Sequence, residues 1–469
     1  MVKKIKALLL YAIAFTLPFN IRYIFNFSAV QHIDGFREYL TISLYFFDIL
    51  FFPLLAITIW EIRKKILTKN FVKKTLNKPI IYFSIFLVVS LFLHNSFSTI
   101  DLYRTGRLLE MIIFFVIIRK TLQQYTVLTY FSFFIFAGGV VQSVIALIQF
   151  IGQKSIGLSW LGESTIGPTI PGVAKFSFEG EKYIRAYGTF PHPNILGIFL
   201  LFALSAGLSL LITKKNLFLN LRQRYRIIFI GEFILIYIGL ILTYSRSIIL
   251  LTFIISFIFA YNKRNFINKT YKNFCQKIHI PFFLQTSLAI IIIFTTLFTS
   301  YNMLTPRLCL HCPDDKSIAL RQTYRKTAIS IISNHSLVGV GLGNFIAVSK
   351  KIIPQLKPWD LQPVHNLYLL VASELGLIGL LLFLTTIFFY AAHNLRLRFL
   401  TKYPLDLFFI LVLMAGFFDH YFWTLQQGQI IFWISLALVS ISKTNKIDSP
   451  KYHFRTVLQN VRQLLKELS

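Results

Sequence analysis

One histidine and several arginines are the residues of this sequence whose types could carry chemistry. His365 is followed by Asn366 at the start of an apolar run that ends near Tyr390. An imidazole changes charge near neutral pH and can act as a general base on a hydroxyl. Asn366 could hold that imidazole or cap the helix that follows. A lone histidine beside an apolar run is more often a hydrogen-bonded boundary residue, so the interpretation depends on its neighbours.

The arginines supply the second half of a possible site. Arg246 lies in a short turn between two apolar runs, where a guanidinium needs an anionic partner or water. Arg321 and Arg325 lie one helical turn apart. Guanidinium groups form paired hydrogen bonds with phosphate and stay protonated, so two or three together would bind a pyrophosphate and stabilise its departure. Their alternatives are a lipid-phosphate contact for Arg246 and an interfacial position for Arg321 and Arg325.

Other motifs do not indicate chemistry. Gly339, Gly341 and Gly343 resemble a phosphate loop but lack the Lys-Ser/Thr that would follow. The ten histidines form no HxxxH or HExxH pair, so we expect no metal. Cys309 and Cys312 could form a bridge or half a metal site, but an ordinary loop is the favoured interpretation.

Three residues after His365 are interpreted as packing elements. Gly376 and Gly379 are expected to allow close helix packing without a ligand role. Glu374 falls on the opposite side of an ideal helix from His365, where we expect a polar contact between helices.

The composition indicates the class of protein. Of 469 residues, 55% are hydrophobic and 14% charged, whereas soluble proteins carry about a quarter charged residues. The chain is therefore predicted to be an all-α polytopic membrane protein. Its net charge of +30 suggests nucleic acid as a partner, but the basic residues occupy short loops between apolar runs, which argues against one.

About twelve transmembrane helices of roughly twenty residues fit the sequence. The first resembles a signal peptide without a cleavage site and is taken as an uncleaved span. The fourth is the weakest, because Arg104, Arg107 and Glu110 fall in its first turns. The expected spans are 7–25, 41–60, 79–95, 104–118, 126–150, 192–212, 227–243, 247–261, 282–301, 366–390, 405–418 and 428–442.

The distribution of basic residues predicts the topology. Alternating spans from an inside start place most of the 48 lysines and arginines inside, so both termini are expected in the cytoplasm. Residues 1–442 form one transmembrane domain with outer loops 151–191 and 302–365, and 443–469 form a cytoplasmic amphipathic tail. The second loop has helical spacing over 318–332, which predicts an interfacial helix. The candidate residues that map outside are Arg185, Arg246, Arg321, Arg325 and His365.

These residues resemble the O-antigen ligase and polymerase family of integral-membrane glycosyltransferases. His365-Asn366, nine residues and then Gly376-Leu-Ile-Gly379 is similar to the family signature H-N/S/Q-x9-G-x-x-G. The upstream blocks also resemble those of the family, and together the likeness covers most of 180–390. One departure is Arg325, where the family often has an aromatic residue. The upstream blocks are Arg185–Asn194, Leu242–Ser247, and Arg321 followed by Leu337–Phe345.

The resemblance implies a GT-C-like, metal-independent, inverting glycosyltransferase that needs no cofactor. Its donor would be a polyprenyl-diphosphate-linked (undecaprenyl-type) glycan, used in cell-envelope polysaccharide or lipopolysaccharide assembly. Arg246 and Arg321 would hold the pyrophosphate with Arg185 as a further donor-site arginine, and His365 would be the catalytic base or a positioning group. Asn366 and Arg325 would support them. The active site would face outward from the cytoplasmic (inner) membrane.

The acceptor and one other class of function stay open. The acceptor hydroxyl could belong to a glycan, to a lipid A core or to a protein, and we favour a polymerase or ligase over a protein O-oligosaccharyltransferase. A lipid-glycan or anion transporter would also need basic residues in a helical bundle. It predicts inverted repeats and basic residues at mid-membrane depth, whereas the sequence has no repeat and its arginines gather at one boundary.

Overall fold

The computed structural model describes residues 2–25, 39, 41–66, 78–94, 98–213, 223–259, 316–357, 360–392 and 404–441. The described chain is mostly helical, which agrees with the predicted fold class. It also contains two short antiparallel hairpins that the all-α prediction did not include. The predicted span 282–301, the pair Cys309 and Cys312, and the tail 443–469 lie outside the described residues.

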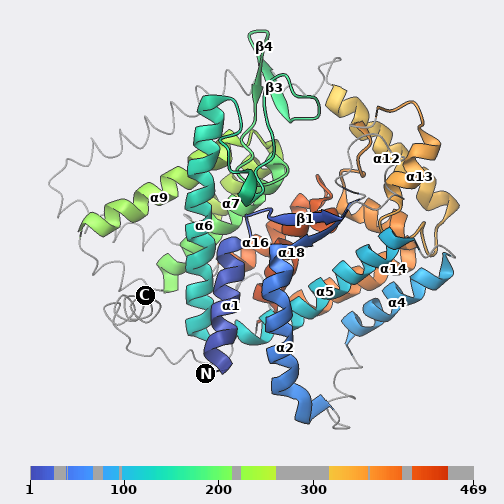
Figure 1. The fold of residues 1–469 in the computed structure, drawn as a ribbon, viewed down its shortest axis with the longest axis horizontal. Coiled ribbons are helices and arrows are strands. Elements are labelled where there is room, and N and C mark those ends of the chain that lie inside the picture. The colour runs from blue at the N-terminus through green and yellow to red at the C-terminus, as the bar shows by residue number, and fades with distance from the viewer. Residues whose placement is uncertain are drawn as a thin grey trace.

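One group of helices forms the left side of the molecule in Figure 1, where α6 stands beside α1. Helix α6 packs against α1, α7 and α9, and its buried face includes Phe131, Ile135 and Phe136. Because lipid tails are as apolar as these side chains, close van der Waals packing of the helices, and not transfer out of water, holds such a group together. The group comprises α1 (Val2–Thr16), α6 (Tyr125–Gly152), α7 (Pro193–Thr213) and α9 (Gln223–Leu242).

A second group gathers around α14 on the opposite side of the molecule (Figure 1). Helix α14 packs against α4, α12 and α13. The apolar residues of α12 that were expected to share one face include Tyr324, Ala328 and Ile331, and all three are buried. The helical spacing predicted for this loop segment is therefore confirmed. The group comprises α4 (Pro79–Leu93), α12 (Lys316–Asn334), α13 (Phe345–Ile352) and α14 (Leu367–Ala391).

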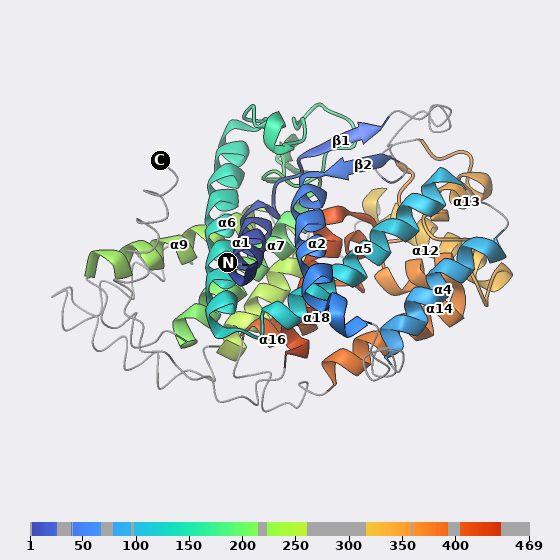
Figure 2. The same cartoon turned by 60° about the horizontal axis from the view of Figure 1, so that its bottom comes forward.

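The remaining helices connect the two groups. Helix α18 is buried along its whole length and packs against α5, α7, α14 and α16. Figure 2 shows α5 running between the two groups. This places α18 at the centre of the core, with the short helix α17 directly before it. The connecting helices are α2 (Phe46–Ile66), α5 (Thr99–Thr121), α16 (Pro404–Ala415), α17 (Tyr421–Thr424) and α18 (Gln426–Ser440).

Two hairpins lie at one end of the helices. Strand β1 (Arg22–Phe25) pairs with β2 (Ile42–Tyr45), and β3 (Lys175–Phe178) pairs with β4 (Glu181–Ile184). The β3–β4 loop, Glu179-Gly180, has positive φ at both residues, as a tight two-residue hairpin turn requires. Figure 1 shows this hairpin beyond the end of α6, within the predicted outer loop 151–191.

Three helices within the described ranges are long and apolar enough to cross a membrane, namely α6, α7 from Pro193 to Leu211, and α14. They coincide with three of the predicted spans. Shorter apolar helices occupy 79–93, 227–242, 246–259 and 404–415. The chain is therefore a helical membrane protein, and the total of about twelve spans stays a prediction.

Helix α14 is interrupted at Gly376, which adopts φ 67° and ψ −174°. A Cβ at Gly376 would come within 2.1 Å of the Leu337 carbonyl oxygen, so only glycine fits there. The backbone N–H groups of Val340 and Gly341 donate to the Ser373 and Glu374 carbonyls, at 3.0 and 2.9 Å. The segment that resembled a phosphate loop thus supports the broken helix. The sequence predicted close packing at Gly376, and the close neighbour of Gly376 is the backbone of Leu337.

The other predicted packing residues behave similarly. A Cβ at Gly379 would lie 2.9 Å from the Phe86 ring on α4, so this glycine lets the two helices approach. Glu374 accepts a hydrogen bond from Trp423 Nε1 at 2.8 Å, which confirms the polar contact expected between helices.

A buried group of charges joins α2 to α5, and we call Asp48, Arg107 and Glu110 the ion cluster. Arg107 Nη1 donates to Asp48 Oδ1 and to Glu110 Oε2, at 2.5 Å each. The backbone N–H of Tyr45 donates to the second oxygen of Asp48 at 2.7 Å. Opposite charges in direct contact explain how α5 carries Arg107 and Glu110 near its middle.

Candidate functional site

Side chains from several separate stretches meet in a cavity of about 280 Å³. His365 comes from the connection before α14, while Asp419 and His420 come from the connection between α16 and α17. His192 precedes α7. The rest of the lining comes from Arg22 and Tyr39 and from residues within 164–173, 187–195, 362–365 and 419–425.

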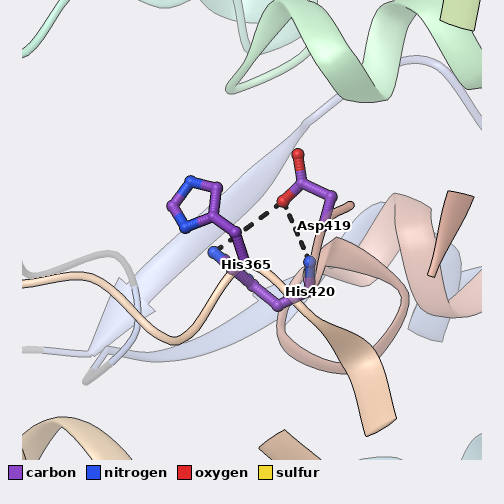
Figure 3. Close-up of side chains that lie close together, drawn as sticks. All are labelled: His365, Asp419 and His420. Atoms are coloured by element: carbon purple, nitrogen blue, oxygen red, sulfur yellow. Dashed lines mark hydrogen bonds and ion pairs between the residues drawn. The ribbon is translucent and has the colours of Figure 1, made fainter. Parts of the chain in front are cut away.

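The carboxylate of Asp419 is the centre of the polar groups. Its Oδ1 accepts a hydrogen bond from the backbone N–H of His420 at 2.9 Å, and its Oδ2 accepts one from Asn194 Nδ2 at 2.6 Å. The ring Nε2 of His420 lies 3.9 Å from Oδ1. Figure 3 shows the Asp419 carboxylate beside His420 and His365. We call His192, His365, Asp419 and His420 the cavity cluster.

The two histidine rings are held by aromatic and polar neighbours. The His365 ring meets the His420 ring edge to face at 5.1 Å between centroids and stacks on Tyr324 at 5.9 Å. Nδ1 of His420 lies 2.9 Å from the Thr424 hydroxyl. Arg104 on α5 donates to the Thr424 carbonyl at 2.9 Å, which anchors this connection to the core.

Burial sets the protonation state of the histidines. It lowers the pKa of His365 to about 4 against the attraction of Asp419, and the nearby charge of Arg321 lowers it further. Burial likewise lowers the pKa of His192 and of His420 to about 3. Burial alone would raise the pKa of Asp419, but attraction to the histidines brings it below its ordinary range. At neutral pH the cavity cluster therefore holds neutral imidazoles and one carboxylate.

The predicted arginines occupy different positions around this cluster. Arg321 is exposed on α12, near enough for its charge to lower the pKa values of His365 and His420. Arg325 is exposed one turn further along α12. Arg246 is half-buried, and neither it nor Arg321 is among the residues that line the cavity. The structure thus brings Arg321 close to His365.

Arg185 is buried and linked to the cluster through one asparagine. Its Nη2 donates to Asn194 Oδ1 at 2.6 Å, and its Nε donates to the Thr243 carbonyl at 2.6 Å. Thr243 precedes Arg246 by three residues. Two of the predicted arginines therefore belong to neighbouring pieces of the chain.

Asn366 begins α14 as its N-cap. Its side-chain oxygen accepts a hydrogen bond from the Leu369 N–H at 2.9 Å. Of the two roles left open by the sequence, capping is the one that this contact supports.

Sequence reasoning missed two residues of the site and did not assign roles to two others. Asp419 and His420 form a polar pair between the predicted spans 405–418 and 428–442, on the side assigned as outer. That position is the signal that could have indicated them. His192 and Asn194 lie within the block that resembles the family, but no single-sequence feature distinguished them from structural residues.

The cavity cluster also has the composition of a metal site. The donor atoms of His365, Asp419 and His420 lie within 4.8 Å of one another, and zinc takes histidine and carboxylate ligands. Both oxygens of Asp419 already accept hydrogen bonds, and Arg321 adds positive charge nearby. Each Asp419 oxygen keeps a further lone pair, so these hydrogen bonds do not block a metal, whereas the positive charge of Arg321 opposes binding of a cation there.

Fold and site together define a helical membrane protein with a histidine-lined polar cavity next to arginines. Residues 232–384 match the model of the O-Antigen ligase family, and this range contains Arg246, Arg321 and His365. The presence of this O-antigen ligase domain confirms the family resemblance and indicates glycan transfer of the ligase or polymerase kind. No curated protein matches the chain.

Proposed function

We propose that the protein transfers a polyprenyl-diphosphate-linked oligosaccharide to a hydroxyl acceptor at the outer face of the cytoplasmic membrane. The observation that carries the proposal is the position of His365. It lines a polar cavity within reach of the charge of Arg321, and both belong to the O-antigen ligase domain.

The donor diphosphate is held by arginines. Arg246 and Arg321 bind its oxygens, with Arg185 as the third cation of the donor site. As the anomeric C–O bond breaks, its electron pair leaves with the diphosphate, and the guanidinium groups stabilise that charge. Because arginine stays protonated at any working pH, this step needs no titration of the donor site.

The acceptor hydroxyl binds beside His365. Its oxygen attacks the anomeric carbon from the side opposite the diphosphate, so the configuration inverts, and its proton passes to the neutral imidazole. Asp419 favours the imidazolium that forms, because the carboxylate attracts its charge. The chemistry uses protein groups alone, and the reaction needs no metal.

The cavity lining favours the end of a glycan as acceptor. Tyr39, Tyr187 and Tyr421 offer aromatic surfaces, while Ser164 and Gln362 offer hydrogen-bonding groups. A small cavity with a few convergent polar groups suits one sugar unit with several hydroxyls. This favours polymerase or ligase activity over transfer to a protein.

The test is transfer by the purified protein reconstituted in liposomes with a polyprenyl-diphosphate oligosaccharide and candidate acceptors. We expect His365→Ala to reduce product formation by roughly 10²- to 10⁴-fold, the usual contribution of a general base. His335→Ala is the matched control, because His335 is an exposed histidine directly after α12. Full activity of His365→Ala would refute the assignment. Glycan crossing the bilayer without a new glycosidic bond would indicate the transporter instead.

A further inference from the structure

Asn194 connects the two sides of the proposed site. It lies in the first turn of α7, directly after Pro193, and is buried. Its side chain lies between Arg185 and Asp419, with 2.6 Å to each. A buried amide with two such short, charge-assisted contacts has a fixed position.

The orientation of the amide follows from chemistry. A guanidinium can only donate and a carboxylate can only accept, so the oxygen of Asn194 faces Arg185 and its nitrogen faces Asp419. An aspartate, a leucine or a reversed amide at this position would fail at one or both contacts. Asn194 therefore fixes the position of the Arg185 guanidinium relative to the Asp419 carboxylate.

The backbone of the same residue fixes one histidine of the cavity cluster. The Asn194 N–H donates to Nδ1 of His192 at 3.2 Å. Since an N–H group can only donate, Nδ1 must carry the lone pair, and the hydrogen of the neutral ring lies on Nε2. His192 lines the cavity and thus presents a hydrogen-bond donor.

Arg185 ties Asn194 to the donor side. Its Nε donates to the Thr243 carbonyl, at the end of the helix that precedes Arg246. The segment containing Asn194 lies outside the residues that match the O-Antigen ligase model, so the connection joins that domain to the rest of the chain.

We propose that Asn194 is a positioning residue for the transfer reaction: it couples the donor-side Arg185 to Asp419 and the acceptor-side histidines. This inference rests on the proposed function. Asn194 acts through its neighbours, holding Asp419 where the carboxylate can stabilise an imidazolium and holding Arg185 toward the donor.

The decisive variant is Asn194→Asp. Its carboxylate still accepts from Arg185 but repels Asp419, because two carboxylates that share a site cannot both ionise easily. When protonated, the new carboxyl can donate to Asp419 and restore both contacts. We expect transfer to fall about 10- to 100-fold at pH 8, the range for an unmade buried hydrogen bond to a charge, and to recover as the pH falls toward 5.

Two further variants separate positioning from simple packing. Asn194→Leu keeps the approximate volume but makes neither hydrogen bond, so we expect low transfer at every pH. Asn334→Asp is the control, since Asn334 is exposed at the end of α12, and its pH profile should follow that of the unmodified protein. If Asn194→Asp and Asn194→Leu lose activity equally, with no recovery of the former at low pH, the proposal is wrong.

A measurement without substrate keeps this test independent of the proposed function. The thermal unfolding midpoint of Asn194→Asp should lie well below that of the unmodified protein at pH 8, and the gap should narrow at pH 5. Asn194→Asp combined with Asp419→Asn restores both hydrogen bonds with the amide on the other side, so its midpoint should recover at pH 8. A gap that does not change with pH would overturn the proposal. If the unmodified protein shows no transfer while the gap narrows, the proposed function fails and the hydrogen-bond arrangement stands.

Discussion

The ion cluster and the cavity cluster are both buried groups of charge, yet they are built from different partners. In the ion cluster two carboxylates share one nitrogen of Arg107. In the cavity cluster a single carboxylate, Asp419, faces neutral imidazoles and an amide. The first holds a guanidinium in direct contact with carboxyl groups, whereas an imidazole of the second can take up a proton without breaking such a contact.

The comparison shows which features distinguish a candidate reactive site from a structural group of charges in this protein. Burial and charge occur in both clusters, so neither feature distinguishes them. The cavity cluster adds imidazoles that are neutral at physiological pH and an accessible volume beside them, while Asp48, Arg107 and Glu110 are absent from the lining of that cavity. The ion cluster should therefore affect stability, and the cavity cluster should affect activity.

Arg107→Met should have the largest effect on stability. It removes the cation and leaves Asp48 and Glu110 buried side by side without a counter-charge, which costs about 3–5 kcal/mol for a broken buried pair. The measurement is the thermal unfolding midpoint of the detergent-purified protein. Arg63→Met serves as the control, because Arg63 is exposed and stacks on Trp60. A midpoint equal to that of the control would show that the ion cluster is not structural.

Replacing the whole ion cluster should undo most of that loss. In the triple variant Asp48→Leu, Arg107→Met and Glu110→Met, no charge remains unpaired, and apolar side chains of similar size often match or exceed a buried ion group in stability. We expect an unfolding midpoint within a few degrees of that of the unmodified protein. The transfer rate should stay within about threefold of normal, which corresponds to a change of ~0.6 kcal/mol in the activation free energy. Loss of activity in a stable triple variant would contradict the division of roles between the clusters.

The two clusters also differ in how far the sequence could predict them. The sequence predicts His365, Arg246 and Arg321 as site residues, because their types, spacing and membrane side point to phosphate and hydroxyl chemistry, and of these three His365 lines the cavity. Helix α14 and its cap at Asn366 followed from an apolar run preceded by a capping residue. Such features are local, and single-sequence reasoning can detect them.

The missing features depend on contacts between distant segments. Asn194 and Asp419 are separated by 225 positions, and nothing in either neighbourhood indicates the other. The break at Gly376 is equally nonlocal, because the residue that requires glycine is Leu337. The two hairpins escaped prediction because their strands are only four residues long. Strands β1 and β2 occupy the end of the predicted span 7–25 and the start of the predicted span 41–60, so both spans were wrong at those ends, whereas β3 and β4 lie in the predicted outer loop 151–191. The Asn194–Asp419 contact and the break at Gly376 are therefore determined by tertiary packing and not by local sequence propensity.

Thr424→Val tests the hydroxyl that contacts His420 in the cavity cluster. It removes the oxygen that lies 2.9 Å from His420 Nδ1 and that donates a longer, 3.3 Å bond to the His420 carbonyl, while keeping the side-chain shape. One neutral hydrogen bond contributes about 1 kcal/mol, so we expect a roughly fivefold lower transfer rate and little change in the unfolding midpoint. Thr424→Ser keeps the hydroxyl and should transfer normally. Equal rates for the two variants would show that the His420 ring needs no such anchor.

The pH dependence of transfer tests whether the cavity histidines are as different from ordinary ones as their surroundings indicate. Burial and the charge of Arg321 lower the pKa of His365 to about 4 against the opposing attraction of Asp419, and burial also keeps His192 and His420 neutral. The neutral imidazole is the active form, so the rate should stay nearly constant from pH 8 to about 5.5 and fall only toward pH 4. An ordinary histidine would lose activity below about pH 6.5.

Stability should follow the same titration with a definite sign. Between about pH 6.5 and pH 4 the unfolded chain binds protons on these histidines while the folded chain does not. Folded stability should therefore decrease as the pH falls through that window, even while transfer persists in its upper part. His365→Gln removes one titrating group, so its unfolding midpoint should depend less on pH than that of the unmodified protein.

The ion cluster provides the contrast, because Arg107→Met leaves these histidines in place and should keep the acid limb of the activity profile. An acid limb at pH 6.5 in the unmodified protein would mean that His365 is solvated like a surface histidine, and the cavity cluster would then lose the property that separates it from the ion cluster.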